Sequence, residues 1–183
     1  MSAGGNVLVV EDDDELRAVY DRVLSEFYSV STAASGARAV ETVTDDTDAV
    51  VVDRPLPEMP VAALASALTS RYDDCCVGLV TGCEPHFDVS RWLGVDDYLV
   101  KPVTTEQLRA TVDRLIALAE YGCIYRRLSQ KRVRKSVLVQ EKPAAELSRC
   151  DKFQRLEAEI DRLEAELDDI ADEVSETTRG LTH

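Results

Sequence analysis

"DAVVVDRPLPEMP", residues 48–60, runs from an apolar segment into a stretch with three prolines. A valine-rich run of this length is typical of a strand that is buried on both faces of a parallel sheet. Proline cannot donate a hydrogen bond to a neighbouring strand, so the sheet has to end here. Asp53 stands at the point of change. We therefore expect its carboxylate to lie at the carboxyl end of a strand and to face an open loop.

Strand-like and helix-like segments alternate along the first 120 residues. The other strand-like segments are NVLVV, YSVSTA, CVGLVT and DDYLV, which begin at residues 6, 28, 76 and 96. Helical spacing of apolar residues follows the strands, at residues 15–27, 36–46, 60–72, 84–93 and 104–121. Asp13 or Asp14 is expected to cap the first of these helices, and Thr104 or Thr105 the last. This alternation predicts an α/β fold in which helices cover both faces of a parallel sheet.

Polar and charged side chains occur where the predicted strands end. The residues at those ends are Glu11, Asp12, Asp53, Thr81 and Lys101. In doubly wound sheets, ligands bind at the carboxyl ends of the strands. Carboxylates brought close together there repel one another, and a divalent cation relieves the repulsion. Oxygen ligands in an incomplete cage suit Mg²⁺, which would keep open positions for water or a phosphoryl group.

Four motifs follow one another at these strand ends: VLVVEDD, VVVDRPLPEMP, LVTG and DDYLVKPV. Their order and spacing make residues 6–120 resemble the receiver domain of two-component response regulators. The resemblance implies a flavodoxin-like, doubly wound five-stranded parallel sheet with the strand order 2-1-3-4-5. It also implies a phosphoacceptor for a sensor histidine kinase. Such a protein takes part in its own Mg²⁺-dependent phosphorylation and dephosphorylation, but it is not an enzyme in the usual sense.

The resemblance also implies roles for the residues at the strand ends. Asp53 is the expected phosphoacceptor, and Thr81 and Lys101 are expected to bind the phosphoryl oxygens. The expected Mg²⁺ ligands are Glu11, Asp12, Asp53 and the backbone carbonyl of Pro55. Tyr98 is the expected aromatic switch, which would rotate as Thr81 moves. Its rotation would alter the face formed by the segments 84–93, 96–100 and 104–121.

Three positions depart from the family pattern. Arg54 follows the acceptor where many receivers have an apolar residue, and Pro60-Val61 stands where glycine is common. Cys83 occupies a position that tunes the dephosphorylation rate in the family. The lifetime of the phosphorylated form therefore stays open.

Residues 153–174 repeat apolar side chains in alternating steps of three and four. The repeating residues are Phe153, Leu156, Ile160, Leu163, Leu167, Ile170 and Val174. This heptad seam predicts an all-α extension with coiled-coil packing. Two arrangements fit the seam. One is a homodimer through residues 153–174, and the other is a helical hairpin within one chain, in which Lys142-Pro143 supplies the turn.

Residues 126–135, RRLSQKRVRK, carry six positive charges. This segment either pairs with the acidic helix 157–173 or contacts nucleic acid along a helix, as in a DNA-binding transcriptional regulator. Opposite charges so near in sequence favour the pairing. The basic and heptad segments together resemble the HalX domain of haloarchaeal response regulators. We expect a receiver domain at residues 5–120, a HalX-like domain at 121–180 and an output to a downstream protein partner.

The bulk composition agrees with a folded protein, and the sequence argues against a membrane span, a signal peptide and a disulfide framework. Of the 183 residues, 45% are apolar, and the net charge is −14. No apolar run approaches the roughly 18 residues of a membrane span. The N-terminal MSAGGN has neither a basic start nor an apolar core, so we expect a cytoplasmic protein without a membrane partner. Five cysteines without a C-x-x-C pair indicate free thiols rather than a disulfide framework or a zinc site.

Overall fold

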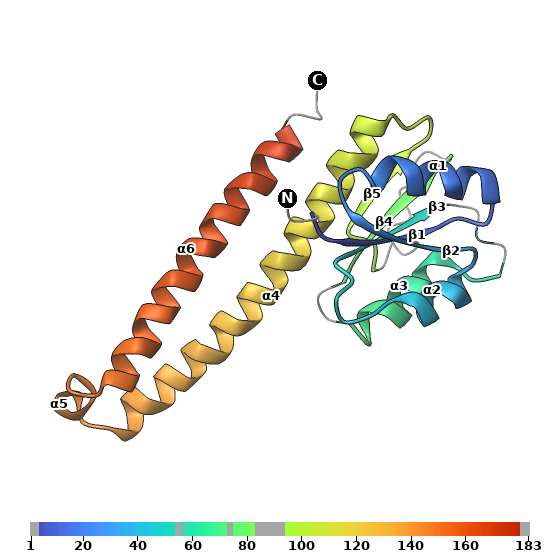
Figure 1. Cartoon of the computed structure of the whole chain (residues 1–183). Helices are drawn as coiled ribbons and strands as arrows, with labels where there is room; N and C mark the ends of the chain where they lie inside the picture. Colours follow the sequence, from blue (N-terminus) through green and yellow to red (C-terminus); the bar gives the residue numbers. More distant parts are fainter. Residues whose placement is uncertain (1–3, 54–55, 57, 73–74, 83–93, 180–183) are drawn as a thin grey trace. The chain divides into compact units, whose positions relative to one another are not determined.

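The computed structural model describes residues 4–53, 56, 58–72, 75–82 and 94–179 (Figure 1). The chain divides into two units, Met1–Ala119 and Glu120–His183. In the described residues, the first unit combines strands and helices, and the second is formed by helices alone. The helix predicted at residues 84–93 lies outside the described residues.

The first unit is built around a parallel sheet. Its strands are β1 (Asn6–Val10), β2 (Ser29–Ala33), β3 (Ala49–Asp53), β4 (Cys76–Thr81) and β5 (Asp97–Val100). They lie in the order β2-β1-β3-β4-β5, and every neighbouring pair is parallel. All five residues of β3 are buried, as its unbroken apolar sequence predicted. The predicted flavodoxin-like fold is confirmed.

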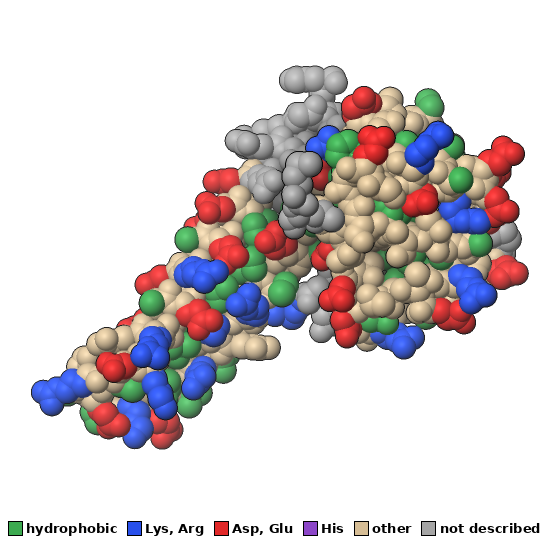
Figure 2. All heavy atoms as spheres, viewed as in Figure 1, with side chains coloured by type: hydrophobic (Ala, Val, Ile, Leu, Met, Phe, Trp, Pro, Cys, Tyr) green, Lys and Arg blue, Asp and Glu red, His purple; other side chains and the backbone are tan. Residues whose placement is uncertain are grey.

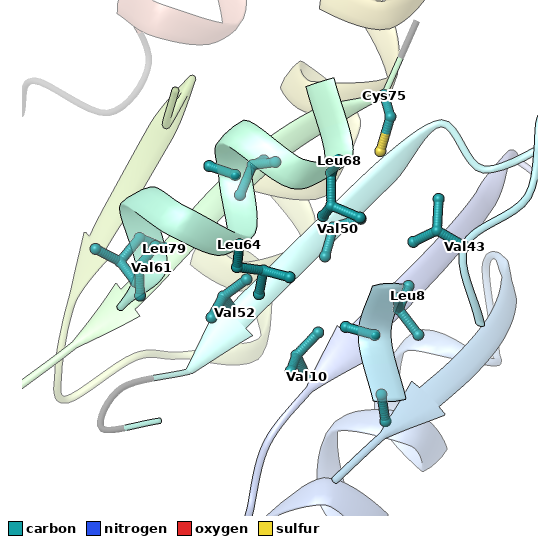
Figure 3. Close-up of a cluster of buried hydrophobic side chains, with 14 residues drawn as sticks. Leu8, Val10, Val43, Val50, Val52, Val61, Leu64, Leu68, Cys75 and Leu79 are labelled. Carbon is teal, nitrogen blue, oxygen red and sulfur yellow. The ribbon is translucent and has the colours of Figure 1, made fainter. Parts of the chain in front are cut away.

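Helices cover both faces of this sheet, as Figure 1 shows. They are α1 (Asp14–Leu24), α2 (Gly36–Thr42), α3 (Val61–Thr69) and the first part of α4 (Thr105–Glu141). Successive side chains of a strand point to opposite faces. Leu8 and Val10 therefore pack in a cluster with α2 and α3, shown in Figure 3. Val7 and Val9 pack on the other face, with residues of α1 and α4.

Side-chain caps fix the starts of two helices close to the strand ends. Asp13 Oδ1 accepts hydrogen bonds from the backbone N–H groups of Glu15 and Leu16, at 2.9 and 3.0 Å. Thr104 and Gln107 form a reciprocal capping box at the start of α4, with N–H to oxygen distances of 3.2 and 3.0 Å. The predicted caps are confirmed, and α1 starts at a fixed place just beyond β1.

The second unit is a helical hairpin. The long helix α4 ends at Glu141, the short helix α5 (Ala144–Leu147) follows, and α6 (Asp151–Arg179) returns along α4. Pro143 stands before α5 and is its N-cap. The predicted helix break at Lys142-Pro143 is therefore confirmed. Six residues of the heptad seam are buried, namely Phe153, Leu156, Ile160, Leu163, Leu167 and Ile170.

Ion pairs join the two long helices of the hairpin. Lys131 Nζ lies 2.8 Å from Glu159, and Lys135 Nζ lies 2.9 Å from Glu157. Arg132 lies 2.8 Å from Glu164. Figure 2 shows lysine, arginine and carboxylate side chains interleaved along this part of the surface. The pairing of the basic segment with the acidic helix is thus confirmed.

The hairpin favours one of the two arrangements predicted for the seam. A homodimer through residues 153–174 needs the apolar face of α6 to be free for a second chain. In the structure this face is buried within one chain, where Ile124 and Leu128 of α4 are buried as well. Burial of apolar area within the chain therefore supports the hairpin. The homodimer through residues 153–174 stays a prediction.

Two further expectations concern the chain as a whole. Among the described residues, no helix combines the length and the hydropathy that a membrane crossing requires. The four described cysteines are free thiols. Burial raises the pKa of Cys75 to about 12. Cys83 lies outside the described residues.

Gly78 of β4 gives a test of the packing between the sheet and α4. A Cβ atom at this position would lie 2.6 Å from Cδ1 of Leu115, which is fully buried. Gly78→Ala should therefore lower the free energy of unfolding by about 1–3 kcal/mol through overpacking. Urea-induced unfolding, followed by circular dichroism, measures the change.

Gly82→Ala is the matched control for this prediction. Among the described residues, no atom lies within 4 Å of a Cβ atom at Gly82, and the residue is exposed. The control should change the free energy of unfolding by less than about 0.5 kcal/mol. Equal stability of the two variants would contradict the described packing of α4 on the sheet.

Candidate functional site

The parallel sheet brings the predicted site residues to one edge. Glu11 follows β1, Asp53 ends β3, Thr81 ends β4 and Lys101 follows β5. Glu11, Asp53 and Thr81 are buried, at 4%, 2% and 2% exposure. The backbone N–H of Lys101 donates to the carbonyl oxygen of Thr81 at 2.8 Å, which extends the pairing of β4 and β5 to the site.

Asp53 is held on both carboxylate oxygens. Lys101 Nζ lies 2.8 Å from Oδ1. The hydroxyl of Tyr20, on α1, donates a hydrogen bond to Oδ2 at 2.7 Å. Although Oδ1 faces the ammonium group, it is buried and accepts no hydrogen bond of good geometry from the described residues. The carboxylate thus has one oxygen in a directed hydrogen bond and one oxygen in an ion pair only.

The enclosure of Asp53 corrects one expectation. The prolines after β3 predicted a carboxylate that faces an open loop. In the structure the Asp53 side chain is 1% exposed, and Tyr20 and Lys101 contact its two oxygens. Access from solvent to the Asp53 carboxylate therefore requires a rearrangement of the groups around it.

Glu11 lies beside other acidic groups. The pKa of Glu11 is raised to about 7, chiefly by burial, and the neighbouring carboxyl groups of Asp53 and Asp12 contribute to the increase. The N–H of Asp13 donates to Glu11 Oε1 at 2.9 Å and opposes the increase. Asp12 itself is exposed. The predicted concentration of carboxylates at the end of β1 is therefore present.

The oxygen atoms at this edge fit a divalent cation. The buried Oδ1 of Asp53 lacks a hydrogen bond, and the repulsion that raises the pKa of Glu11 would be relieved by positive charge. In the part of the chain that the structure describes, no three His, Cys, Asp or Glu side chains form a ready metal cluster. A cation would therefore keep several waters, as Mg²⁺ does in proteins. Pro55, the predicted backbone ligand, lies outside the described residues.

Tyr98 is the predicted switch residue. It lies on β5 next to Leu79 of β4 in the strand register, and it is 48% exposed. Thr81 ends the same neighbouring strand, two positions beyond Leu79. Its role as a switch stays a prediction.

Tyr20 is the site residue that sequence reasoning missed. Its sequence signal is the apolar stripe of the helix predicted at residues 15–27, to which Tyr20 belongs. A buried tyrosine needs a partner for its hydroxyl, and the partner had to come from a strand next to α1. That requirement could have pointed to Asp53.

The comparisons with known proteins agree with this geometry. Residues 7–113 match the response regulator receiver domain, and residues 117–181 match the HalX domain. The first match alone covers more than half of the chain. The chain therefore belongs to the response regulator receiver family, and a HalX domain follows its receiver domain.

Individual relatives cover mainly the receiver part. A protein of Haloferax volcanii is 34% identical over 111 residues, which is 60% of this chain and 19% of the relative. The transcriptional regulatory protein PrrA of Mycobacterium tuberculosis is 34% identical over 114 residues, 60% of this chain and 49% of PrrA. A cyclic di-GMP phosphodiesterase of Thermotoga maritima is 30% identical over 143 residues, 76% of this chain and 38% of the relative. The chain thus spans half or less of the length of each of these relatives.

Solved structures show the same fold. The response regulator TrrA of Thermotoga maritima, in complex with Mg²⁺-BeF, is 26% identical with a TM-score of 0.53. That match covers 61% of this chain and 98% of TrrA. The receiver domain of a histidine kinase from Syntrophus aciditrophicus is 29% identical with a TM-score of 0.54, over 62% of this chain and 90% of that domain.

The raised pKa of Glu11 predicts a pH dependence of stability. Between pH 4.5 and about 7 the folded protein holds a proton on Glu11 that the unfolded chain has lost. The contribution of Glu11 to the free energy of unfolding therefore falls as the pH rises through this window. Without divalent cations, Glu11→Gln should gain stability relative to the wild type from pH 4.5 to 7, and the gap should then level off. Urea unfolding across this pH range measures it.

The Asp53→Asn background provides the control for this prediction. Asp53 contributes to the raised pKa of Glu11. The pH-dependent gap that Glu11→Gln opens should therefore be smaller when Asp53 has been replaced by a neutral side chain. A gap that grows toward acid pH would contradict the described environment of Glu11.

Proposed function

We propose that this response regulator accepts a phosphoryl group on Asp53 from a sensor histidine kinase. The observation that carries the proposal is the Asp53–Lys101 ion pair of 2.8 Å at the carboxyl edge of the sheet. It stands beside Glu11, whose carboxyl lies close enough to Asp53 for the two to interact. A nucleophilic carboxylate, a cation and further carboxylates at one place are what phosphoryl transfer to aspartate requires.

The proposed chemistry assigns one task to each residue. An oxygen of Asp53 attacks phosphorus in line with the leaving group, and the ammonium group of Lys101 moves to an equatorial oxygen. The hydroxyl of Thr81 binds a second oxygen. Mg²⁺ would be held by Glu11, Asp12, Asp53 and the carbonyl of Pro55, and when bound it supplies positive charge to the transferring group.

The proposed output is a change of surface. Movement of Thr81 toward the phosphoryl group would leave space for Tyr98, whose exposed ring supports such a rotation. The altered face would consist of residues 84–93, β5 and the start of α4. Because α4 carries residues of both units, we propose that the helical region takes part in the signal to a downstream protein partner. The proposed domains are a receiver at residues 5–120 and a HalX-like domain at 121–180, in a cytoplasmic protein.

The alternative of DNA binding by residues 126–135 receives less support. Three of the six cations of this segment, Lys131, Arg132 and Lys135, form ion pairs with α6. A cation that is already paired has less to gain from a phosphate of nucleic acid, because the existing pair has to break first. The proposal therefore gives this segment a structural task.

Phosphotransfer from acetyl phosphate tests the assignment of Asp53. The wild type should become labelled in the presence of Mg²⁺ and hardly at all in the presence of a chelator, since the carboxylate repulsion at the site then stays uncompensated. Asp53→Asn should abolish labelling, because it removes the nucleophilic oxygen. Intact-mass spectrometry detects the added phosphoryl group.

Asp46→Asn serves as the matched control. Asp46 is an exposed carboxylate of the same unit, and its removal should leave labelling at the wild-type level. If Asp53→Asn and the wild type were labelled equally, Asp53 would not be the phosphoacceptor.

A further inference from the structure

Tyr20 connects α1 directly to the proposed phosphoacceptor. Its hydroxyl donates to Asp53 Oδ2 at 2.7 Å, across 33 positions of sequence. Tyr20 is 9% exposed and Asp53 is 2% exposed, so water competes little for this hydrogen bond. A carboxylate oxygen accepts hydrogen bonds, so the Tyr20 hydroxyl is the donor in this contact.

The surroundings of Tyr20 would suit a residue without a hydroxyl. Its ring packs in an apolar cluster with Leu24 of α1 and with Val9, Val51 and Val80 of the sheet. A leucine or phenylalanine would fill such a place without a polar atom to satisfy. The hydroxyl adds one thing that an apolar side chain cannot, which is a directed donor at the carboxylate.

The position of α1 keeps this donor aimed. Asp13 caps the helix, and Arg17 Nη1 donates to the carbonyl oxygen of Glu11 at 2.7 Å. The first turn of α1 is thereby tied to the end of β1, next to the site. Tyr20 follows Arg17 by three positions, on the same side of the helix, so its ring is held between this anchor and the sheet.

We infer that Tyr20 sets the lifetime of phosphorylated Asp53 by its hydrogen bond to Oδ2. This inference rests on the proposed function of Asp53. Oδ2 already accepts the Tyr20 hydroxyl, whereas Oδ1 accepts no directed hydrogen bond from the part of the chain that the structure describes. Oδ1 is therefore the oxygen that bonds to phosphorus, and Oδ2 stays the carbonyl oxygen of the acyl phosphate.

The hydrolysis step shows where the hydrogen bond acts. Water attacks phosphorus, the new O–P bond forms, and the bond between phosphorus and Oδ1 breaks. The electron pair of the broken bond stays on the Asp53 carboxylate, and the protons of the water go to inorganic phosphate and the solvent. Negative charge thus returns to both carboxylate oxygens, including the one that Tyr20 contacts.

A donor to such an oxygen accelerates the step, because a hydrogen bond to a charged acceptor is stronger than one to a neutral carbonyl. In a loose transition state for phosphoryl transfer, most of this charge has already developed. Tyr20 therefore stabilises the transition state of hydrolysis more than the acyl phosphate. In the formation of the acyl phosphate, the carboxylate starts with its full charge, so the effect of Tyr20 on that rate is smaller.

Tyr20→Phe in the full chain tests this inference. The wild type and the variant are labelled with acetyl phosphate and Mg²⁺, the donor is removed, and the loss of label is followed by intact-mass spectrometry. Tyr20→Phe should lose its label about 10-fold more slowly than the wild type, which is the difference expected between a charged and a neutral acceptor. Its labelling rate should change by less than this factor.

Tyr28→Phe is the matched control. Tyr28 lies in the same apolar cluster, and its hydroxyl donates to a different carboxylate, Asp113 Oδ1, at 2.6 Å. Its loss should lower stability to a similar extent without changing the decay of the label. Tyr20→Gln, which can keep a donor, and Tyr20→Leu, which cannot, repeat the comparison if Tyr20→Phe folds poorly. The leucine variant should decay slowly, and the glutamine variant should decay nearer to the wild-type rate.

The outcomes separate this inference from the proposed function. Labelling of the wild type but not of Asp53→Asn, with unchanged or faster decay in Tyr20→Phe, would overturn the role of Tyr20 and leave the phosphoacceptor in place. Slow decay in both Tyr20→Phe and Tyr28→Phe would also overturn it, because the effect would then be structural. A wild type that takes up no label would overturn both.

Discussion

Parallel pairing of the strands is the constraint on which the rest of the structure depends. In a sheet of the order β2-β1-β3-β4-β5, the carboxyl ends of β1, β3, β4 and β5 meet at one edge. The ion pair between Asp53 and Lys101 forms there, between residues 48 positions apart. Neither residue is close to the other along the chain, and no local structure could bring them together. The apolar strands therefore supply the burial energy that holds opposed charges in place.

The fold followed from the sequence because its signals were local and repeated. Valine-rich runs of four to six residues, helical spacing between them and caps at Asp13 and Thr104 are all visible without a partner strand. The site followed in part for the same reason, since a charged residue or a hydroxyl stood at each of the strand ends that form it. What could not be predicted is how side chains close over one another. The contact of Tyr20 with Asp53 depends on the seating of α1 on the sheet and on one rotamer, and the sequence records neither.

The burial of Asp53 is the finding that changes the functional picture most. We had expected the Asp53 carboxylate to be exposed to solvent. Its burial argues against a carboxylate that is permanently accessible from solvent. Family membership does not depend on that expectation, because it rests on the matched sequence of the receiver domain. The enclosed carboxylate instead describes a resting arrangement, in which Tyr20 and Lys101 satisfy a buried charge that would otherwise be costly. On the proposed function, a phosphoryl donor would have to compete with both contacts.

The charges of the hairpin act differently from those of the receiver site. The three ion pairs between α4 and α6 join partly exposed side chains, while the leucine and isoleucine seam beneath them is buried. At molar ionic strength the screening length falls to about 3 Å, and exposed pairs lose most of their attraction. Apolar packing in the seam does not depend on this screening, so α4 and α6 would stay packed together at molar salt. The charges of the hairpin would then attract a partner only over distances of direct contact. Recognition of the hairpin would depend mainly on the fit of the two surfaces.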